Sequence, residues 1–312
     1  MAVKLKELSN EPERLCGGHR ACPGCAGPTA IRQVLLAAGK DVVVGCATGC
    51  MEVSTTIFPY TAWQVPFIHS AFENAAATVS GVEAAYKALR RSGKINRDIR
   101  FITFGGDGGT YDIGFQSLSG AMERGHRMLY VCYDNGAYMN TGIQRSSATP
   151  KGAATTTAPA GKKKQGKEQN RKDLTACLIA HDIPFVAQAS VHNPIDLMTK
   201  VQTALSVDGP SFINVIAPCH RGWRFKMEQA IDLAKDAVEC GYWPLFEVHN
   251  HVWKINYKPK EKRLVADWMK RQGRFEHLFK NPANQHIIDE IQADVDRKWD
   301  ELLQREAATN KA

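Results

Sequence analysis

The sequence predicts an α/β protein in which helices cover both faces of a doubly wound, mostly parallel sheet. Short apolar segments that fit buried strands alternate with longer segments that fit helices. Glycine-rich turns follow several of the expected strands. The 312 residues, of which 44% are hydrophobic and 23% charged, are enough to bury a substantial core.

The first half of the chain alternates expected helices and strands. The expected helices are residues 32–36, 72–92 and 113–123, and the expected strands are residues 41–44, 100–104 and 128–133. The last two strands and the helix between them form a βαβ unit. In such units ligands bind beyond the carboxyl ends of the strands.

The second half begins with a segment of different composition. Residues 146–172 are rich in Thr, Ala, Pro, Gly and Lys, so we expect a long exposed loop that is either functional or mobile. Helices are then expected at 173–181 and 194–205, strands at 185–189 and 211–216, helix from Met227, irregular aromatic structure at 243–257, and a final helix at 287–306. The expected division is an α/β domain at 1–225 and an irregular or helical extension at 226–312, packed on that domain or on a partner subunit.

Charge and hydropathy restrict the partners and the compartment. The formal net charge of +8 suits a solvated basic surface or an acidic protein partner, and we expect neither nucleic acid nor a membrane. No apolar run approaches the roughly 20 residues of a membrane-spanning helix, and residues 1–7 lack the apolar region of a signal peptide. We therefore expect a cytoplasmic protein, in which the nine cysteines are not a disulfide framework.

The turn after the strand at 100–104 has the features of a diphosphate and metal site. Residues 105–109 read Gly-Gly-Asp-Gly-Gly, and Asn135 follows the next strand, 28 positions after Asp107. Glycine N–H groups can approach a diphosphate, and the carboxylate and amide oxygens at adjacent strand ends suit Mg²⁺. A tight turn without a ligand explains the glycines alone, but the position of Asn135 and of residues 138–142 favours a binding site. The Gly-x-Gly-x-x-Gly pattern of a Rossmann dinucleotide site is absent.

The N-terminal region contains a C-x-x-C motif, Cys22-Pro23-Gly24-Cys25. Such a pair occurs in thioredoxin-like, zinc and iron–sulfur sites. A zinc ribbon needs a second C-x-x-C, which the sequence lacks, and no clear strand precedes Cys22 as a thioredoxin motif requires. These observations favour a cluster whose remaining ligands come from elsewhere in the chain.

Cys50 and Cys219 are the best candidates for those ligands. Each follows an expected strand and lies beside Gly or Pro in a segment that resembles a loop. Cys16 and Cys46 compete with them because each is close to a proposed ligand, although Cys46 ends an apolar run and is expected in the core. The remaining cysteines lie in expected strands or helices and are interpreted as buried thiols: Cys132, Cys177 and Cys240.

Together these segments make the chain resemble the β subunits of pyruvate:ferredoxin oxidoreductase and related 2-oxoacid:ferredoxin oxidoreductases. The resemblance extends over most of the chain. It rests on residues 18–25 (GHRACPGC), 47–50 (ATGC), 72–76 (FENAA), 106–108 (GDG) with 111–114 (YDIG), 138–144 (YMNTGIQ) and Pro218-Cys219 before Gly222-Trp223. It implies the thiamine-diphosphate-binding fold, with cluster-binding loops and a helical C-terminal extension.

The resemblance also implies a role for individual residues. Cys22, Cys25, Cys50 and Cys219 match the ligands of a [4Fe–4S] cluster. Asp107, Asn135 and the backbone carbonyl of Ala137 match the Mg²⁺ ligands, and Asn140 matches a catalytic residue that reaches toward the substrate. The residues implied to contact the cofactor are Thr48, Cys50, Gly106, Asp107, Gly108, Gly109, Asn135, Ala137, Tyr138 and Asn140.

The implied reaction is the oxidative decarboxylation of pyruvate to an acyl-CoA and CO₂, with coenzyme A as co-substrate. Electrons would pass singly through the cluster to ferredoxin or a similar acidic carrier. The carboxylate that activates thiamine is expected on a separate α subunit rather than at Glu73, so the chain should be inactive alone. A γ subunit and a ferredoxin-like δ subunit are further implied partners. Residues 162–172 are either a docking surface for the carrier or a solvated loop.

Three alternatives stay open. The same machinery would serve oxalate, phenylglyoxylate or branched-chain 2-oxoacids. A decarboxylase resembling acetolactate synthase would keep Asp107 and Asn135 without needing the four cysteines. A non-enzymatic subunit would use the cysteines to bind structural zinc.

Overall fold

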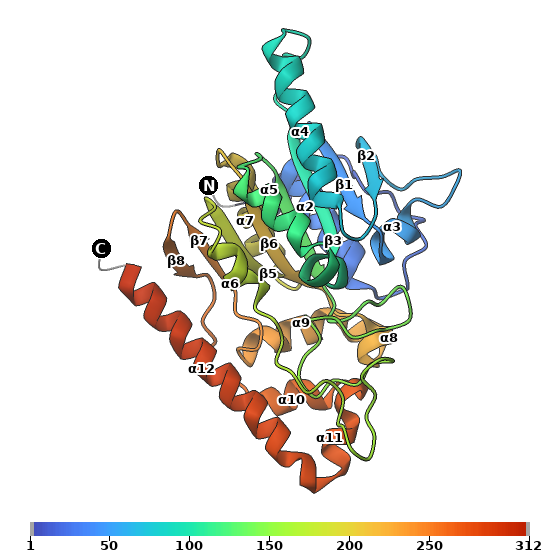
Figure 1. Ribbon diagram of the computed structural model, residues 1–312, viewed down its shortest axis with the longest axis vertical. Helices are drawn as coiled ribbons and strands as arrows, with labels where there is room; N and C mark the ends of the chain where they lie inside the picture. Colours follow the sequence, from blue (N-terminus) through green and yellow to red (C-terminus); the bar gives the residue numbers. More distant parts are fainter. Residues whose placement is uncertain (1–2, 310–312) are drawn as a thin grey trace.

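One eight-stranded sheet forms the centre of the computed structural model, which describes residues 3–309 (Figure 1). Met1, Ala2 and residues 310–312 lie outside the described part, and with them the first two residues of the segment 1–7. The strand order is β2-β1-β3-β4-β6-β5-β7-β8, in which the first six strands are parallel and the last two antiparallel. The strands are β1 (Val42–Ala47), β2 (Phe67–Ser70), β3 (Arg100–Gly106), β4 (Leu129–Asp134), β5 (Phe185–Ser190), β6 (Ser211–Ile216), β7 (Phe246–His249) and β8 (Val252–Ile255).

Helices cover both faces of the sheet. One face packs against α2, α7 and α9, and the other against α4, α5 and α6. The helices are α1 (Leu5–Leu8), α2 (Ala26–Ala38), α3 (Cys50–Thr55), α4 (Ala75–Arg91), α5 (Phe115–Glu123), α6 (Leu174–Ile179), α7 (Pro194–Ser206), α8 (His220–Trp223), α9 (Ala230–Glu239), α10 (Val265–Lys270), α11 (Glu276–Lys280) and α12 (Gln285–Thr309). The predicted doubly wound α/β class is therefore confirmed. No helix in the described part of the chain is both long and apolar enough to cross a membrane.

The strand order places a crevice between β1 and β3. After β1 the chain adds β2 on one side and then returns to add β3 on the other. At such a switch point the connections leave the sheet in opposite directions, which opens a crevice at the carboxyl ends of the two strands. The segments that follow β1 and β3 carry Cys50 and Asp107, so the topology brings these two residues to one edge.

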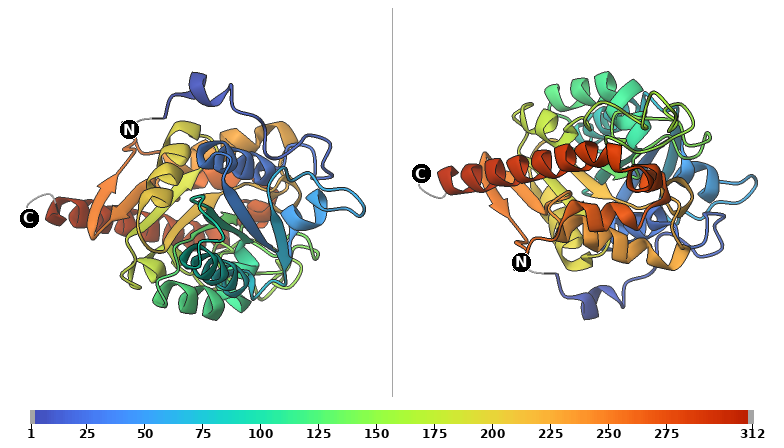
Figure 2. Two further views of the ribbon diagram at one scale, coloured as in Figure 1. Left: turned by 90° about the horizontal axis from the view of Figure 1, so that it is seen from above. Right: turned by 90° about the horizontal axis from the view of Figure 1, so that it is seen from below.

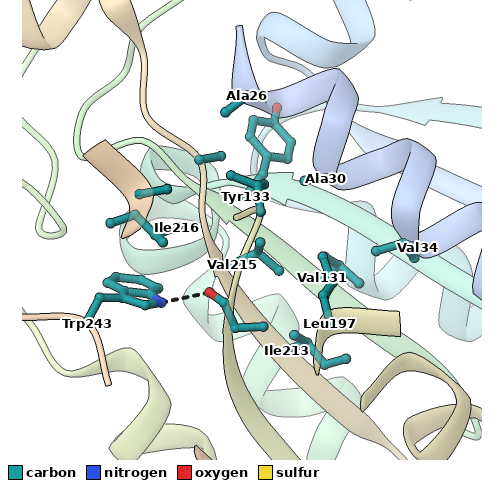
Figure 3. Packing of buried hydrophobic residues seen from close by; sticks show 14 of the residues in the cluster. Ala26, Ala30, Val34, Val131, Tyr133, Leu197, Ile213, Val215, Ile216 and Trp243 are labelled. Carbon is teal, nitrogen blue, oxygen red and sulfur yellow. Dashed lines mark hydrogen bonds between the residues drawn. The ribbon is translucent and has the colours of Figure 1, made fainter. Parts of the chain in front are cut away.

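Alternation along β4 divides the core between the two faces. Val131 and Tyr133 point toward α2, whereas Tyr130 and Cys132 belong to the cluster that includes α4 and α5. Figure 3 shows Val131 and Tyr133 among residues of α2, α7 and β6, with the Tyr133 ring reaching toward Ala26. The side-chain direction of Tyr133 is thus fixed by the strand period.

Several local predictions need correction. Residues 243–257 are not wholly irregular, because β7 and β8 form an antiparallel hairpin there. The loop 146–172 lacks helix and strand, as predicted, but it is not exposed throughout, since 152–155 and 166–167 are buried. Cys50 opens helix α3 rather than lying in a loop.

The C-terminal region ends in the predicted long helix. α12 spans 25 residues and packs along α10 and β8. Its C-terminal end lies beside the hairpin, where the Trp253 N–H donates to the hydroxyl of Thr309 at 3.2 Å (Figures 1 and 2).

Candidate active site at the carboxyl ends of the parallel strands

A pocket lies at the carboxyl ends of β1, β3 and β4. All ten residues expected to contact the cofactor line it: Thr48, Cys50, Gly106, Asp107, Gly108, Gly109, Asn135, Ala137, Tyr138 and Asn140. Four more residues of these segments and Phe72 complete the lining. The structure therefore brings the expected residues together, while their individual roles stay predictions.

Asp107 is buried and held in place by hydrogen bonds. Its Oδ2 accepts from the Ser146 hydroxyl at 2.5 Å, and its Oδ1 accepts from the Asn135 backbone N–H at 3.2 Å. Burial, together with the charge of Asp134, raises the pKa of Asp107 well above its usual range, and the two hydrogen bonds oppose that rise. A buried carboxyl of this kind favours a cation that replaces its proton.

Asn135 and Ala137 each bring one more oxygen to the same point. Its side-chain oxygen faces Asp107 Oδ1 at 2.9 Å and the carbonyl oxygen of Ala137 at 3.0 Å, with no donor between them. Reversing the amide would let its nitrogen donate to both, whereas a cation would stabilise the three oxygens as they stand. Neighbouring ligands of an octahedral Mg²⁺ ion are about 2.9 Å apart, because each lies about 2.05 Å from the metal. The donor set therefore fits Mg²⁺.

A second buried carboxylate, Asp134, lies at the end of β4 beside this group of oxygens. Its Oδ2 accepts from the Tyr111 hydroxyl at 2.6 Å and from Arg171 at 2.9 Å, and its Oδ1 accepts from the Gly136 N–H at 3.0 Å. The Arg171 guanidinium also lies 4.4 Å from the centre of the Trp243 ring. No sequence pattern identified Asp134, Arg171 or Ser146, and Tyr111 entered only as part of the motif at 111–114, without a role.

The four predicted cluster cysteines meet on the other side of the pocket. Cys25 precedes α2, Cys50 opens α3 and Cys219 precedes α8, where its Sγ accepts from the Gly222 N–H at 3.5 Å. Burial, and then the neighbouring thiols, raise the pKa of Cys50 to about 12 and that of Cys25 to about 11. The neighbours that act on Cys50 are Cys219, Cys25 and Cys22.

The competing cysteines behave differently. Cys46 is fully buried on β1, within the hydrophobic core. Cys16 is not among the thiols that affect Cys25, Cys50 or Cys219. The geometry therefore favours Cys50 and Cys219 over both competitors as partners of the C-x-x-C pair.

The segments that carry the four thiols also hold buried polar atoms without a partner. Within residues 3–309 these are His19 Nδ1 and His220 Nδ1, together with Tyr133 Oη from β4 and Arg274 Nη2 beside Trp223. Unpaired buried polar groups of this kind fit a charged group bound among the thiols. In the same part of the chain, no three His, Cys, Asp or Glu side chains converge closely enough to hold one metal ion.

The positions of two further residues, Glu73 and His69, bear on the site. Glu73 is exposed and does not line the pocket. His69, to which the sequence assigned no role, contacts the Thr48 hydroxyl through Nε2 at 2.7 Å.

Comparison with known proteins gives the class. Residues 43–215 match the family described as thiamine pyrophosphate enzyme, C-terminal TPP binding domain. The fold resembles that of a 2-oxoglutarate:ferredoxin oxidoreductase from Magnetococcus marinus, with a TM-score of 0.56, 20% sequence identity and coverage of 75% of this chain and 80% of that chain. The fold and the pocket thus define a thiamine pyrophosphate enzyme.

Curated relatives identify the family within that class. The chain is 51% identical to pyruvate synthase subunit PorB of Thermotoga maritima, over 99% of this chain and 98% of the relative. It is 52% identical to PorB of Methanocaldococcus jannaschii, over 92% and 95%, and 42% identical to ketoisovalerate oxidoreductase subunit VorB of Pyrococcus abyssi, over 93% and 92%. The chain belongs to the family of pyruvate synthase subunit PorB, whose members are subunits of thiamine-dependent 2-oxoacid oxidoreductases.

Proposed function

We propose that this chain is the β subunit of an enzyme that oxidatively decarboxylates pyruvate to an acyl-CoA and CO₂ and passes the electrons through a [4Fe–4S] cluster to ferredoxin. When bound, thiamine diphosphate would supply the carbon nucleophile for the 2-oxoacid and the cluster would accept single electrons. Pyruvate is favoured over branched-chain 2-oxoacids because the identities to PorB subunits, 44–52%, all exceed the 42% to VorB.

One observation carries the proposal: Cys50 lines the same pocket as Asp107 and Asn135. The oxygen ligands proposed for Mg²⁺ and one ligand proposed for the cluster therefore line the same pocket. A thiamine enzyme without electron transfer has no need of a thiol cluster at that position. The proximity supports a direct electron path between the two cofactors.

Each group has a stated task in this proposal. Asp107, Asn135 and the Ala137 carbonyl would hold Mg²⁺, and the N–H groups of residues 106–109 would bind the diphosphate. Cys22, Cys25, Cys50 and Cys219 would hold the cluster. Asn140, exposed at the edge of the pocket, would contact the substrate as the catalytic residue.

The chain would act only within a complex. We propose an α subunit that supplies the activating carboxylate, together with γ and ferredoxin-like δ subunits, and we propose residues 226–312 as the extension that meets them. Lys162, Lys163 and Lys164 are exposed and would attract an acidic carrier. All nine cysteines are free, which supports a reducing compartment such as the cytoplasm.

The test compares Cys50→Ala with Cys46→Ala in the anaerobically purified complex. Cys50→Ala should abolish the visible absorption that dithionite bleaches, and should lower iron and sulfide to the levels of the remaining clusters. Binding of thiamine diphosphate should stay measurable. Cys46→Ala, its matched control on the preceding strand, should retain full iron and sulfide.

Either of two results would contradict the proposal. Loss of the cluster in Cys46→Ala but not in Cys50→Ala would show that the ligands are assigned wrongly. Stoichiometric zinc without sulfide in the wild-type chain would exclude a cluster altogether. Turnover of a panel of 2-oxoacids with coenzyme A and ferredoxin would then decide between pyruvate and the branched-chain, oxalate and phenylglyoxylate alternatives.

A further inference from the structure

Tyr133 places a hydroxyl group between the two halves of the site. It is the penultimate residue of β4, its side chain is 2% exposed, and it lines the same pocket as Asp107 and Cys50. Its Oη is buried without a hydrogen-bond partner among the described residues. A phenylalanine would fill the same space without leaving a buried polar atom unpaired, so the hydroxyl needs an explanation.

The neighbours of this hydroxyl come from both halves. A Cβ atom added to Gly49, next to Cys50, would lie 2.8 Å from Oη, and one added to Gly106 would lie 3.3 Å from it. A side chain at position 49 would collide with the Tyr133 ring, so the position before Cys50 requires glycine. At position 106 a Cβ atom would make an unusually close contact with the same ring, so a larger side chain would not fit there. In Figure 3 the ring reaches toward Ala26, the residue after Cys25.

The protonation state makes Tyr133 a hydrogen-bond donor. A tyrosine hydroxyl keeps its proton near neutral pH, so it can donate one hydrogen bond as well as accept. The backbone amide of Met51, in the first turn of α3, faces the phenol oxygen. An amide N–H can only donate, so the O–H of Tyr133 still needs an acceptor.

We propose that the Tyr133 hydroxyl donates a hydrogen bond to a sulfur atom of the cluster on its Cys50 side, and that this bond raises the reduction potential of the cluster. Tyr133 is then a positioning residue that tunes the electron acceptor next to the thiamine pocket. The inference rests on the proposed function, because it needs a cluster at Cys22, Cys25, Cys50 and Cys219. Hydrogen bonds to cluster sulfurs stabilise the more negative, reduced state and so raise the potential.

The experiment is a redox titration of the assembled complex, followed by electron paramagnetic resonance, with Tyr133→Phe against wild type. Iron and sulfide content should be unchanged, the cluster midpoint should shift to a more negative potential, and thiamine diphosphate affinity should stay within about twofold of wild type. Tyr130→Phe is the matched control. It lies on the same strand, but its hydroxyl faces Thr110 at 3.1 Å on the opposite side of the sheet, so the midpoint should not move.

Each other outcome has a separate meaning. An unchanged midpoint in Tyr133→Phe, or an equal shift in Tyr130→Phe, overturns the inference. Weaker thiamine diphosphate binding with an unchanged midpoint also overturns it, because the hydroxyl would then serve that cofactor. A wild-type complex without a cluster at this site contradicts the proposed function itself. Tyr133→Met provides the same comparison if the phenylalanine variant does not assemble.

Discussion

At the ends of β3 and β4 the buried carboxylates have partners, whereas the cysteine segments beside β1 and β6 leave buried polar atoms without them. Asp107 accepts from Ser146 and Asn135, and Asp134 accepts from Tyr111 and Arg171. On the cysteine side, His19 and His220 each have a buried atom without a partner among the described residues, and so does Tyr133, which reaches toward this side from β4.

This difference shows how far the protein organises each half of the site before a metal ion or cluster binds. The metal side is organised in advance by its own hydrogen bonds, so an arriving ion meets oxygens already in place. The cysteine side has protonated thiols and unpaired donors, which a negatively charged cluster would satisfy. The cluster is therefore expected to complete the fold of its half, as metals do in many small sites.

Two arginines near Asp134 offer the largest test, because both line one pocket with that carboxylate and only Arg171 forms an ion pair with it in the described part of the chain. Arg171 pairs with Asp134 at 2.9 Å, whereas Arg274 is 2% exposed and lies 3.9 Å from the Trp223 ring centre, with a hydrogen bond to Gln272. Arg171→Met leaves a buried carboxylate without its cation and should lower the free energy of unfolding by about 3–5 kcal/mol. Urea unfolding followed by tryptophan fluorescence measures this change.

Arg274→Met is the matched control in the cluster-free chain. Its buried charge forms no ion pair among residues 3–309, and burial lowers its pKa to about 9, although Asp134 and Asp107 oppose that fall. Loss of the stacking on Trp223 should be offset by removal of a buried charge, so the free energy of unfolding should change by less than about 1 kcal/mol. Equal, large losses in both variants would show that the ion pair between Arg171 and Asp134 is not the source of the difference.

The second prediction concerns the hydrogen bond that orients Asp107. Ser146→Ala removes the donor to Oδ2 and should weaken Mg²⁺-dependent binding of thiamine diphosphate by about 10- to 100-fold. Isothermal titration of the assembled complex at fixed Mg²⁺ gives the affinity. Ser147→Ala is the control, since Ser147 contacts Asp112 only through its backbone N–H at 3.0 Å. An unchanged affinity in Ser146→Ala would mean that the metal side is not organised by this contact.

Sequence reasoning reached Asp107 and Asn135 because both follow directly from strand ends, and parallel strands bring their carboxyl ends to one edge. It missed Ser146, which lies 39 positions after Asp107 in a loop without periodicity. That loop is folded back by Lys167, whose Nζ donates to the carbonyl oxygens of Ser147 and Thr149 at 3.0 and 2.6 Å. Such tertiary contacts leave no local pattern to detect.

The β7–β8 hairpin was missed for a related reason. Its two-residue turn uses Asn250 and His251, both with positive φ, at 46° and 68°. Turns of this type are usually marked by glycine, which is absent here. Cys50 and Cys219 were chosen over Cys16 and Cys46 largely through family resemblance, because one-dimensional spacing does not show which loops meet in space.

The smallest predicted effect needs no mutation, because the pKa of Asp107 makes Mg²⁺ binding depend on pH. In the metal-free chain this pKa is raised by burial and by Asp134, so the stability of that form falls as pH rises from the usual carboxyl range through the raised value. Mg²⁺ has to displace the proton, and below the raised pKa its apparent affinity should therefore fall by about tenfold per pH unit. Mg²⁺ titrations at several pH values, followed by thiamine diphosphate binding, measure the slope.

Because Ser146→Ala removes a bond that lowers the pKa of Asp107, the variant should show the same slope displaced to higher pH. A pH-independent affinity in both proteins would show that Asp107 is already ionised before Mg²⁺ binds.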